Sequence, residues 1–325
     1  PKTFRILDKK TVIKEMGAGI NLGNTMDGGL YDSSETGWQA YKTTKDYIKA
    51  LHDAGYNTVR IPVTWGSHIN DDYTIDEAWI NRVQEIVDYC VDQDMYAIVN
   101  IHHDGAANHD DRGNNTPACW LDTYSQNIEK VYQKYEGVWN TIANRFKDYD
   151  EHVIFESMNE VTDAHGTATN EDDAVLNALN QLFINTVRAT GSNNTKRWLA
   201  ITGRFATTAA ITTMPEDTLA DSGDLGTTRL MFAVHIYKSN NNVRWSYDDL
   251  KQWQSSMSSS YKNVGNLDSN MPIYVGEYGV RTKAQNGSAT GYNNAERALN
   301  YEMCAAIADF YNAVPVVWDQ GTGNY

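Results

Sequence analysis

The chain has 325 residues and a mass of 36.5 kDa, a length at which an α/β barrel can still form one domain. Hydrophobic residues make up 41% of it, and no stretch approaches the roughly 20 apolar residues that a membrane helix requires. A net charge of −15 disfavours nucleic acids and anionic membranes as partners, because both bind clustered Lys and Arg. We therefore expect a soluble monomer with one domain, residues 1–325, that acts on a neutral or cationic substrate.

Apolar and β-branched runs alternate with helical patterns along the chain, and no linker separates them. The sequence predicts strands over residues 17–22, 57–63, 95–103, 152–158, 197–202, 229–237, 272–277 and 314–318. It predicts helices over residues 43–54, 76–92, 125–147, 173–190, 247–261 and 295–311. Alternating strands and helices indicate a parallel sheet, and eight strands are the number that closes a (β/α)8 TIM barrel.

The two ends of the sequence carry their own expectations. It ends at Tyr325, soon after the last predicted strand, so the helix that should cover this strand is absent from it. Because both faces of a parallel sheet are normally buried, we expect the natural chain to continue or its remainder to be disordered. The chain begins at Pro1 without the basic and apolar segments of a signal peptide, so it is either cytosolic or already processed.

Polar and aromatic residues gather at the C-terminal ends of six of the eight predicted strands. They are Arg60 with Trp65, His102 with His103, Asn159 with Glu160, His235 with Tyr237, Glu277, and Trp318 with Asp319. Barrel enzymes build their active sites at this end of the sheet. We therefore predict one active site at the mouth of the barrel.

Two of these residues are carboxylates that follow apolar strands, Glu160 in HVIFESMNE and Glu277 in MPIYVGEYG. A single glutamate in such a place is more often part of an ion pair than a catalyst. A pair of them is what cleavage of a glycosidic bond requires. Arg60 can keep one carboxylate ionised as a nucleophile, while the other, without such a cation, can keep its proton and act as an acid.

Seven segments resemble a known family, and they are GINLGNTMD, NTVRIPVTW, VNIHHD, IFESMNE, VHIY, VGEYG and VPVVWDQG. They are similar to the strand-end motifs of glycoside hydrolase family 5, in the usual order, from about residue 15 to the C-terminus. The FESMNE and NLGNT forms resemble the endoglucanase-rich bacterial and rumen fungal branch. The resemblance implies an endo-β-1,4-glucanase with a TIM-barrel fold and a polysaccharide substrate.

The resemblance also implies roles for single residues. It makes Glu160 the general acid/base and Glu277 the nucleophile of a retaining mechanism, in which the two carboxyl groups stand roughly 5–5.5 Å apart. It also implies Asn159 for the sugar 2-hydroxyl, His102 with His103 for sugar binding and Asn24 for a further hydroxyl. His235 and Tyr237 alternate along one predicted strand and so face the same side, where Tyr237 could bind the nucleophile and His235 could orient the carboxylates or the sugar. Trp318 is the best candidate for stacking on the cleaved sugar, because a pyranose ring offers an apolar face to an indole.

A metal site is a second interpretation of His102 and His103, because Asp104, His109, Asp110 and Asp111 follow closely. Adjacent residues on a strand point to opposite faces, and no helical HxxxH spacing is present, so we expect neither a metal nor a cofactor. The loop also lacks the ligand spacing of a calcium site. Two rival functions stay open: a metal-dependent barrel hydrolase and a non-catalytic carbohydrate-binding barrel.

The remaining expectations concern aromatic residues, substrate and location. Trp79, Trp139 and Trp253 lie in predicted helices and are expected to pack in the core. Weaker candidates for sugar subsites are Trp38, Trp65, Trp120 and Trp245. Xyloglucan, mixed-linkage glucan, mannan and xylan stay open as substrates beside cellulose. Because such a polymer cannot enter a cell, we expect the protein to be secreted or attached to the cell surface.

Overall fold

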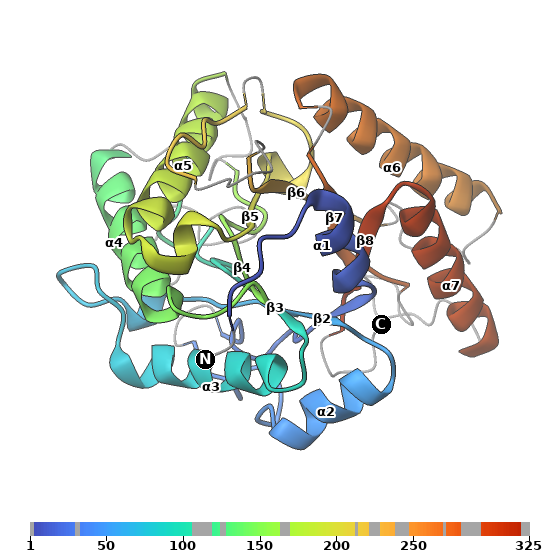
Figure 1. Cartoon of the computed structure of the whole chain (residues 1–325), viewed down its shortest axis with the longest axis horizontal. Coiled ribbons are helices and arrows are strands. Elements are labelled where there is room, and N and C mark those ends of the chain that lie inside the picture. The colour runs from blue at the N-terminus through green and yellow to red at the C-terminus, as the bar shows by residue number, and fades with distance from the viewer. Residues whose placement is uncertain are drawn as a thin grey trace.

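The eight strands of this protein form a closed parallel barrel (Figure 1). A computed structural model describes residues 3–29, 33–105, 119–123, 128–162, 170–211, 214–220, 228–237, 247–268, 271–280 and 294–319. The strands are β1 (Gly19–Asn21), β2 (Thr58–Ile61), β3 (Tyr96–Asn100), β4 (Val153–Glu156), β5 (Leu199–Ile201), β6 (Leu230–Ile236), β7 (Ile273–Tyr278) and β8 (Ala313–Val317). Each strand pairs with the next along the chain, and β8 pairs with β1 to close the barrel. The predicted TIM barrel is confirmed.

Helices surround the barrel on its outer face (Figure 1). They are α2 (Lys45–Asp53), α3 (Glu77–Val91), α4 (Ile128–Phe146), α5 (Asn170–Ala189), α6 (Tyr247–Leu267) and α7 (Asn294–Phe310). One further helix, α1 (Lys9–Met16), lies at an end of the barrel, and 3-10 turns cover η1 (Gly66–His68), η3 (Ser192–Thr195) and η4 (Arg204–Ala206). Thr44 and Asp76 start α2 and α3, because each side chain accepts the N–H of the third residue that follows. All six predicted helices are present, and the predicted start of α4 at residues 125–127 lies outside the described residues.

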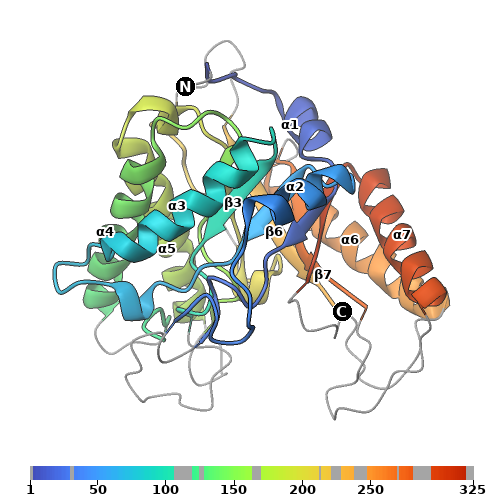
Figure 2. The ribbon, with the colours of Figure 1, turned by 90° about the horizontal axis from the view of Figure 1, so that it is seen from below.

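The short helix α1 was not predicted, and it lies across the end of the barrel at which the strands begin (Figure 2). Asp8 caps it by accepting the N–H of Thr11. Val12 and Met16 are buried in the same cluster as Ile98, a residue of the barrel interior. With eight residues, α1 is too short to show a convincing helical period in sequence.

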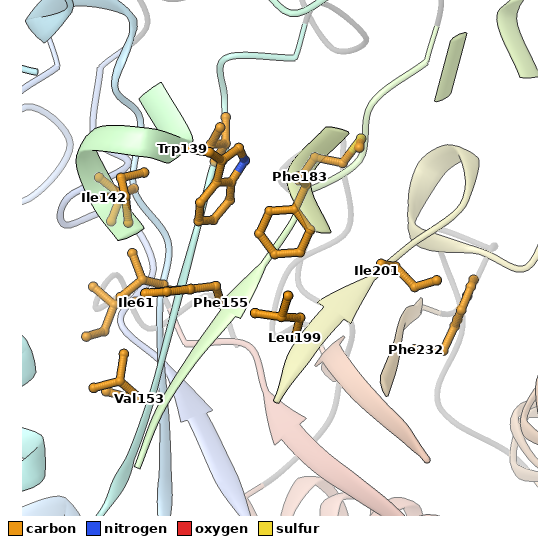
Figure 3. Close-up of a cluster of buried hydrophobic side chains, with 14 of the residues drawn as sticks. Ile61, Trp139, Ile142, Val153, Phe155, Phe183, Leu199, Ile201 and Phe232 are labelled. Atoms are coloured by element: carbon orange, nitrogen blue, oxygen red, sulfur yellow. The ribbon is translucent and has the colours of Figure 1, made fainter. Parts of the chain in front are cut away.

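The hydrophobic core forms two layers, one inside the barrel and one between the sheet and the helices. Adjacent strand residues divide between them: Ile154 belongs to the inner cluster and Phe155 to the outer one. In the outer layer the ring of Trp139 meets that of Phe183 edge to face, with centroids 4.5 Å apart (Figure 3). Trp79, Trp139 and Trp253 are buried, as the sequence predicted. These layers hold the strand ends, and therefore the site, in place.

The described chain after β8 consists of Trp318 and Asp319 and contains no helix. A hollow of about 860 Å³ lies beside this strand, lined by residues of α1, α7 and β8. Among the described helices, none combines the length and the apolar character needed to cross a membrane.

Candidate active site

Residues from four strand ends meet at the mouth of the barrel. Arg60 lies on β2, His235 on β6 and Glu277 on β7, and Glu160 follows β4. One carboxylate oxygen of Glu160, one of Glu277 and a ring nitrogen of His235 all lie within 4.8 Å of one another. This limit applies to the nearest atoms of the three side chains; the carboxyl groups of a retaining glycosidase stand roughly 5–5.5 Å apart, and those of an inverting one about 6.5–9.5 Å apart to admit a water molecule. The fold therefore brings together two carboxylates that are 117 residues apart in the sequence.

Arg60 is the centre of the hydrogen-bond network and is completely buried. Its Nε and Nη2 atoms donate to the two carboxylate oxygens of Glu156 at 2.8 and 2.7 Å. Nη1 donates to Glu277 at 2.8 Å and to Asn21 at 2.9 Å, and Nη2 also donates to Asn159 at 2.9 Å. Burial lowers the pKa of Arg60, but the charges and hydrogen bonds of the two glutamates outweigh it and raise this pKa well above its ordinary value. Arg60 therefore stays positively charged.

Both carboxylate oxygens of Glu277 are held by hydrogen bonds. Oε1 accepts from Nη1 of Arg60, and Oε2 accepts from the hydroxyl of Tyr237 at 2.8 Å. The predicted contacts of Arg60 and Tyr237 with this carboxylate are thus confirmed. Two hydrogen-bond donors on one carboxylate fix its orientation, as a nucleophile requires.

A β-bulge in the pairing of β6 with β7 directs the side chain of Glu277 towards the site. Val234 pairs with Val275 and His235 pairs with Glu277, so Gly276 is one extra residue on β7. A Cβ atom at Gly276 would lie 3.1 Å from Nε2 of His235. Glycine therefore lets the imidazole of His235 approach β7 closely, and the bulge redirects the side chain of Glu277, which follows it.

Glu160 has a close nitrogen partner, which corrects one expectation from the sequence. Nδ1 of His235 lies 2.7 Å from Oε1 of Glu160 and 3.6 Å from Oε2 of Glu277. Burial raises the pKa of Glu160, but the hydrogen bond and charge of His235, together with the charge of Arg60, outweigh it and hold this pKa below its usual value. The expectation that the surroundings of Glu160 favour its protonated form was wrong. Glu160 and His235 instead form a pair that can share one proton.

Asn159 is fixed directly beside the two carboxylates. Its backbone N–H donates to the carbonyl of Ile101 at 2.9 Å, and its side-chain oxygen accepts from Arg60. With the oxygen engaged in this way, the amide NH2 is the group that Asn159 can offer to a sugar hydroxyl. Its predicted bond to the 2-hydroxyl stays a prediction.

Sequence reasoning missed several members of the network. Glu156 is buried and accepts hydrogen bonds from Arg60, from Asn100 at 3.1 Å and from the hydroxyl of Tyr274. Asn21, in the GINLGN segment, accepts a hydrogen bond from Arg60, whereas the sequence predicted a role only for Asn24 of this segment, at a sugar hydroxyl. Glu156, Asn100 and Asn21 are polar residues within otherwise apolar strands, and that was the available signal. The sugar-binding role of the half-buried Asn24 stays a prediction.

His102 and His103 do not lie on a strand, which corrects a second argument. β3 ends at Asn100, so strict alternation between faces no longer applies. The Nε2 atoms of His102 and His103 both approach Oδ2 of Asp27, at 3.9 and 3.5 Å. No described residue donates a hydrogen bond to this buried oxygen. Burial lowers the pKa of His102 well below its ordinary value, with the charges of His103, Arg60 and His235 acting in the same direction, so its ring is neutral.

Three clusters among the described residues could each offer three metal ligands: Asp27 with His102 and His103, Asp150 with Glu151 and His152, and Glu160 with His235 and Glu277. In the first, the Asn100 amide NH2 faces Nδ1 of His102 at 3.1 Å and also donates to Glu156. Nδ1 must therefore accept, which leaves the proton on Nε2, the atom nearest to Asp27. A metal ligand shows the opposite pattern, since its second ring nitrogen donates to an acceptor. His109, Asp110 and Asp111 lie outside the described residues.

The aromatic candidates divide into buried and accessible rings. Trp318 stacks parallel to His102 at the barrel mouth, with an interplanar angle of 5° and centroids 5.9 Å apart. Trp38 is 39% exposed and meets His103 edge to face. Trp65 is completely buried and donates to the carbonyl of Asn100, so its suggested role in a subsite was wrong. Trp245 lies outside the described residues.

Asp104 supports two tryptophans beside the site. Its carboxylate accepts from the backbone N–H of Trp65 at 3.0 Å and from Nε1 of Trp120 at 2.6 Å. Burial outweighs these bonds and raises the pKa of Asp104 from 3.8 to about 6. The folded protein therefore binds this proton more tightly than the unfolded chain does.

The raised pKa of Asp104 predicts a pH effect on stability. As pH falls from about 6 towards about 4, the folded state takes up a proton that the unfolded state does not, so this carboxyl favours folding more strongly at low pH. We expect Asp104→Asn, which keeps an acceptor oxygen but binds no proton, to remove this pH-dependent change in the free energy of unfolding, which is on the order of 3 kcal/mol. Urea unfolding of both proteins at several pH values measures it. Identical pH slopes for wild type and variant would contradict the prediction.

Comparisons with known proteins cover nearly the whole chain. A model of the family described as cellulase (glycosyl hydrolase family 5) matches residues 20–324. Endoglucanase A of Paenibacillus barcinonensis is 33% identical over 348 residues, which cover 98% of this chain and 84% of that protein.

Two solved structures show the same likeness. The family 5 xyloglucanase from Paenibacillus pabuli, in complex with ligand, matches with a TM-score of 0.83 and 32% identity, over 97% of this chain and 93% of that one. A GH5-4 broad specificity endoglucanase from Ruminococcus champanellensis, with bound cellotriose, matches with a TM-score of 0.82 and 32% identity, over 99% of this chain and 93% of that one.

Proposed function

This chain belongs to the cellulase family of glycosyl hydrolases, family 5, and on that premise we propose that it is an endo-β-1,4-glucanase with a retaining two-glutamate mechanism. Membership makes it a glycoside hydrolase that acts on β-glucans. The observation that carries the finer proposal is the separation of at most 4.8 Å between carboxylate oxygens of Glu160 and Glu277. The different partners of these two carboxylates support different roles for them.

In the first step, Glu277 attacks the anomeric carbon and forms a glycosyl-enzyme ester. Arg60 and Tyr237 hold its oxygens in place for this attack, each at 2.8 Å. The bond to the leaving oxygen breaks as that oxygen receives the proton held by the pair of Glu160 and His235. The leaving sugar departs as a neutral alcohol.

In the second step, a water molecule takes the place of the leaving sugar. Glu160 removes a proton from this water, which attacks the anomeric carbon and releases the carboxylate of Glu277. The lowered pKa of Glu160 suits this base role, and the hydrogen bond from His235 stabilises its negative charge. Two inversions at one carbon give a product with the original β configuration.

The substrate proposed is the β-1,4-glucan backbone, with cellulose and xyloglucan both accepted. Support comes from the neighbouring structures, one named a xyloglucanase and another a broad specificity endoglucanase with bound cellotriose. Within this chain, the 39% exposed Trp38 offers a flat apolar surface on which a pyranose ring can stack, while Trp318 at the barrel mouth is 8% exposed. Because these polymers stay outside cells, we also propose that the protein acts outside the cell or on its surface, as a monomer.

A hydrolysis panel tests this function. Carboxymethyl cellulose, xyloglucan, mixed-linkage glucan, xylan and mannan are each incubated with the protein, and the products are separated by chain length. We expect a rapid fall in viscosity and oligosaccharides of mixed length from the glucans. Sugars released from chain ends alone would contradict the endo mode. Activity confined to mannan or xylan would contradict the proposed β-1,4-glucan substrate.

The same panel distinguishes the rival functions. Activity that disappears with EDTA and returns with added metal would support a metal-dependent hydrolase. It would also contradict the inference that Nε2 of His102 carries the proton. Binding to the glucans without any hydrolysis would support a carbohydrate-binding barrel. We expect hydrolysis that EDTA does not change.

A further inference from the structure

One buried carboxylate determines how Arg60 can distribute its hydrogen bonds. Nε and one N–H of Nη2 form a bidentate pair with Glu156. Because a guanidinium is planar and rigid, a bidentate pair along one edge fixes the directions of the three remaining donors. Those donors reach Glu277, Asn159 and Asn21.

We infer that Glu156 is a positioning residue for the proposed reaction: it orients Arg60 so that one guanidinium holds both the nucleophile Glu277 and the amide of Asn159. The inference rests on the proposed function, because it concerns the same two-glutamate site. It adds a residue that acts through Arg60 and not on the sugar.

Burial excludes direct contact between Glu156 and a substrate. The side chain of Glu156 is 1% exposed, whereas that of Glu160 is 24% exposed. Its Oε1 also accepts from Asn100 at 3.1 Å, and its Oε2 also accepts from the hydroxyl of Tyr274. These bonds tie Glu156 to β3 and β7 as well as to β2, so its carboxylate is fixed from several strands.

The negative charge of Glu156 contributes to the positioning of Arg60 in addition to its hydrogen bonds. Burial raises the pKa of Glu156, but the charge and hydrogen bonds of Arg60 outweigh it and hold this pKa below its ordinary value, so the group stays ionised. Its negative charge offsets the positive charge of Arg60 inside the barrel. Without it, Arg60 could turn an edge with two N–H groups towards Glu277 and bind both of its oxygens, including the Oε2 atom that Tyr237 now holds.

The test compares two variants that each neutralise one partner of a buried arginine–carboxylate pair. Glu156→Gln removes the charge beside Arg60. Asp217→Asn is the matched control, because Asp217 forms an equally buried bidentate pair with Arg188, both bonds 2.9 Å long. Arg188 also bonds to the carbonyl of Arg197, just before β5 and thus at the opposite end of the barrel. For each protein, kcat and KM on a cello-oligosaccharide, the pH profile of kcat/KM and the melting temperature are measured.

We expect both variants to melt at a lower temperature than wild type, while Glu156→Gln alone loses roughly 100-fold in kcat with little change in KM. We also expect its pH profile of kcat/KM to differ from that of wild type, because the charge of Arg60 is no longer offset beside the site. A Glu156→Gln variant with wild-type kcat and pH profile would overturn the inference. If wild type and Asp217→Asn both fail to hydrolyse any glucan, the proposed function fails and this inference falls with it.

A milder variant covers the case in which Glu156→Gln does not fold. Tyr274→Phe removes one donor to Glu156 and leaves all charges in place. We expect kcat to fall about tenfold with KM unchanged, since a loosened Glu156 lets Arg60 and the nucleophile shift. An unchanged kcat in a variant with a lowered melting temperature would show a structural role alone and would overturn the inference.

Discussion

Replacing Glu277 with alanine is expected to lower kcat on β-glucans by roughly 10⁴- to 10⁶-fold, because an alanine side chain cannot form the glycosyl-enzyme. Arg60 and Tyr237, which hold the carboxylate in the wild type, would then face an empty space. Binding of the sugar depends on other residues, so KM should change far less than kcat. Steady-state kinetics on carboxymethyl cellulose or a cello-oligosaccharide measure the loss.

Azide rescue identifies the role of Glu277 more specifically than the loss of activity does. In Glu277→Ala, azide can occupy the space of the carboxylate and attack an activated aryl β-cellobioside from the face opposite to the leaving group. The product is an α-glycosyl azide. Glu85→Ala serves as a control, because Glu85 is half exposed on the surface of α3, and it should keep full activity without azide. Substantial hydrolysis of β-glucans by Glu277→Ala would refute the nucleophile assignment.

The second large effect concerns Glu160. Glu160→Ala is expected to lower kcat on polysaccharides by roughly 10²- to 10⁴-fold, the usual contribution of general acid–base catalysis. An aryl glycoside whose leaving group needs no proton should still form the glycosyl-enzyme, and a burst of released phenol would report it. Azide should then give a β-glycosyl azide, since it attacks the intermediate on Glu277.

The pH profile provides a separate test of the pair formed by Glu160 and His235. As pH rises, the pair loses the proton that the leaving oxygen requires, so wild-type kcat/KM should fall along a basic limb. This limb should be absent when Glu160→Ala acts on the activated aryl glycoside. Equal losses on polysaccharide and aryl glycoside, with the basic limb retained, would assign the acid to another residue.

The strand ends explain how much of the site could be predicted from the sequence. Apolar and β-branched runs marked all eight strands, and parallel strands must deliver their C-terminal residues to one edge. Glu160, Glu277 and Arg60 were therefore expected near one another, and the structure brings them together.

The residues that sequence reasoning missed are those whose role depends on distant partners. Glu156 and Tyr274 lie within apolar strands and are 118 residues apart, yet their side chains meet inside the barrel. A period of two tells which residues share a face, but it does not tell which of them will bond across the barrel. Asp27 lies in a loop after β1, where no periodic pattern exists to place it.

Errors at strand boundaries had the largest consequences. The sequence extended the third strand to His103, whereas β3 ends at Asn100, and this difference reversed the conclusion about which way the two histidines point. Trp65 also follows its strand by several residues, and it turns into the core, where Asn100 accepts its indole N–H. Hydrophobic patterns locate the middle of an element more securely than its end, because end residues are fixed by contacts with other elements.

The configuration of the first product tests the central claim most directly. Proton NMR of the reducing-end signals, recorded during the first minutes of hydrolysis of a cello-oligosaccharide, distinguishes the two anomers before they interconvert. A retaining reaction through Glu277 and Glu160 predicts that the β anomer appears first and the α anomer grows in later by mutarotation. If the α anomer appears first, a single displacement by water takes place and Glu277 is not the nucleophile.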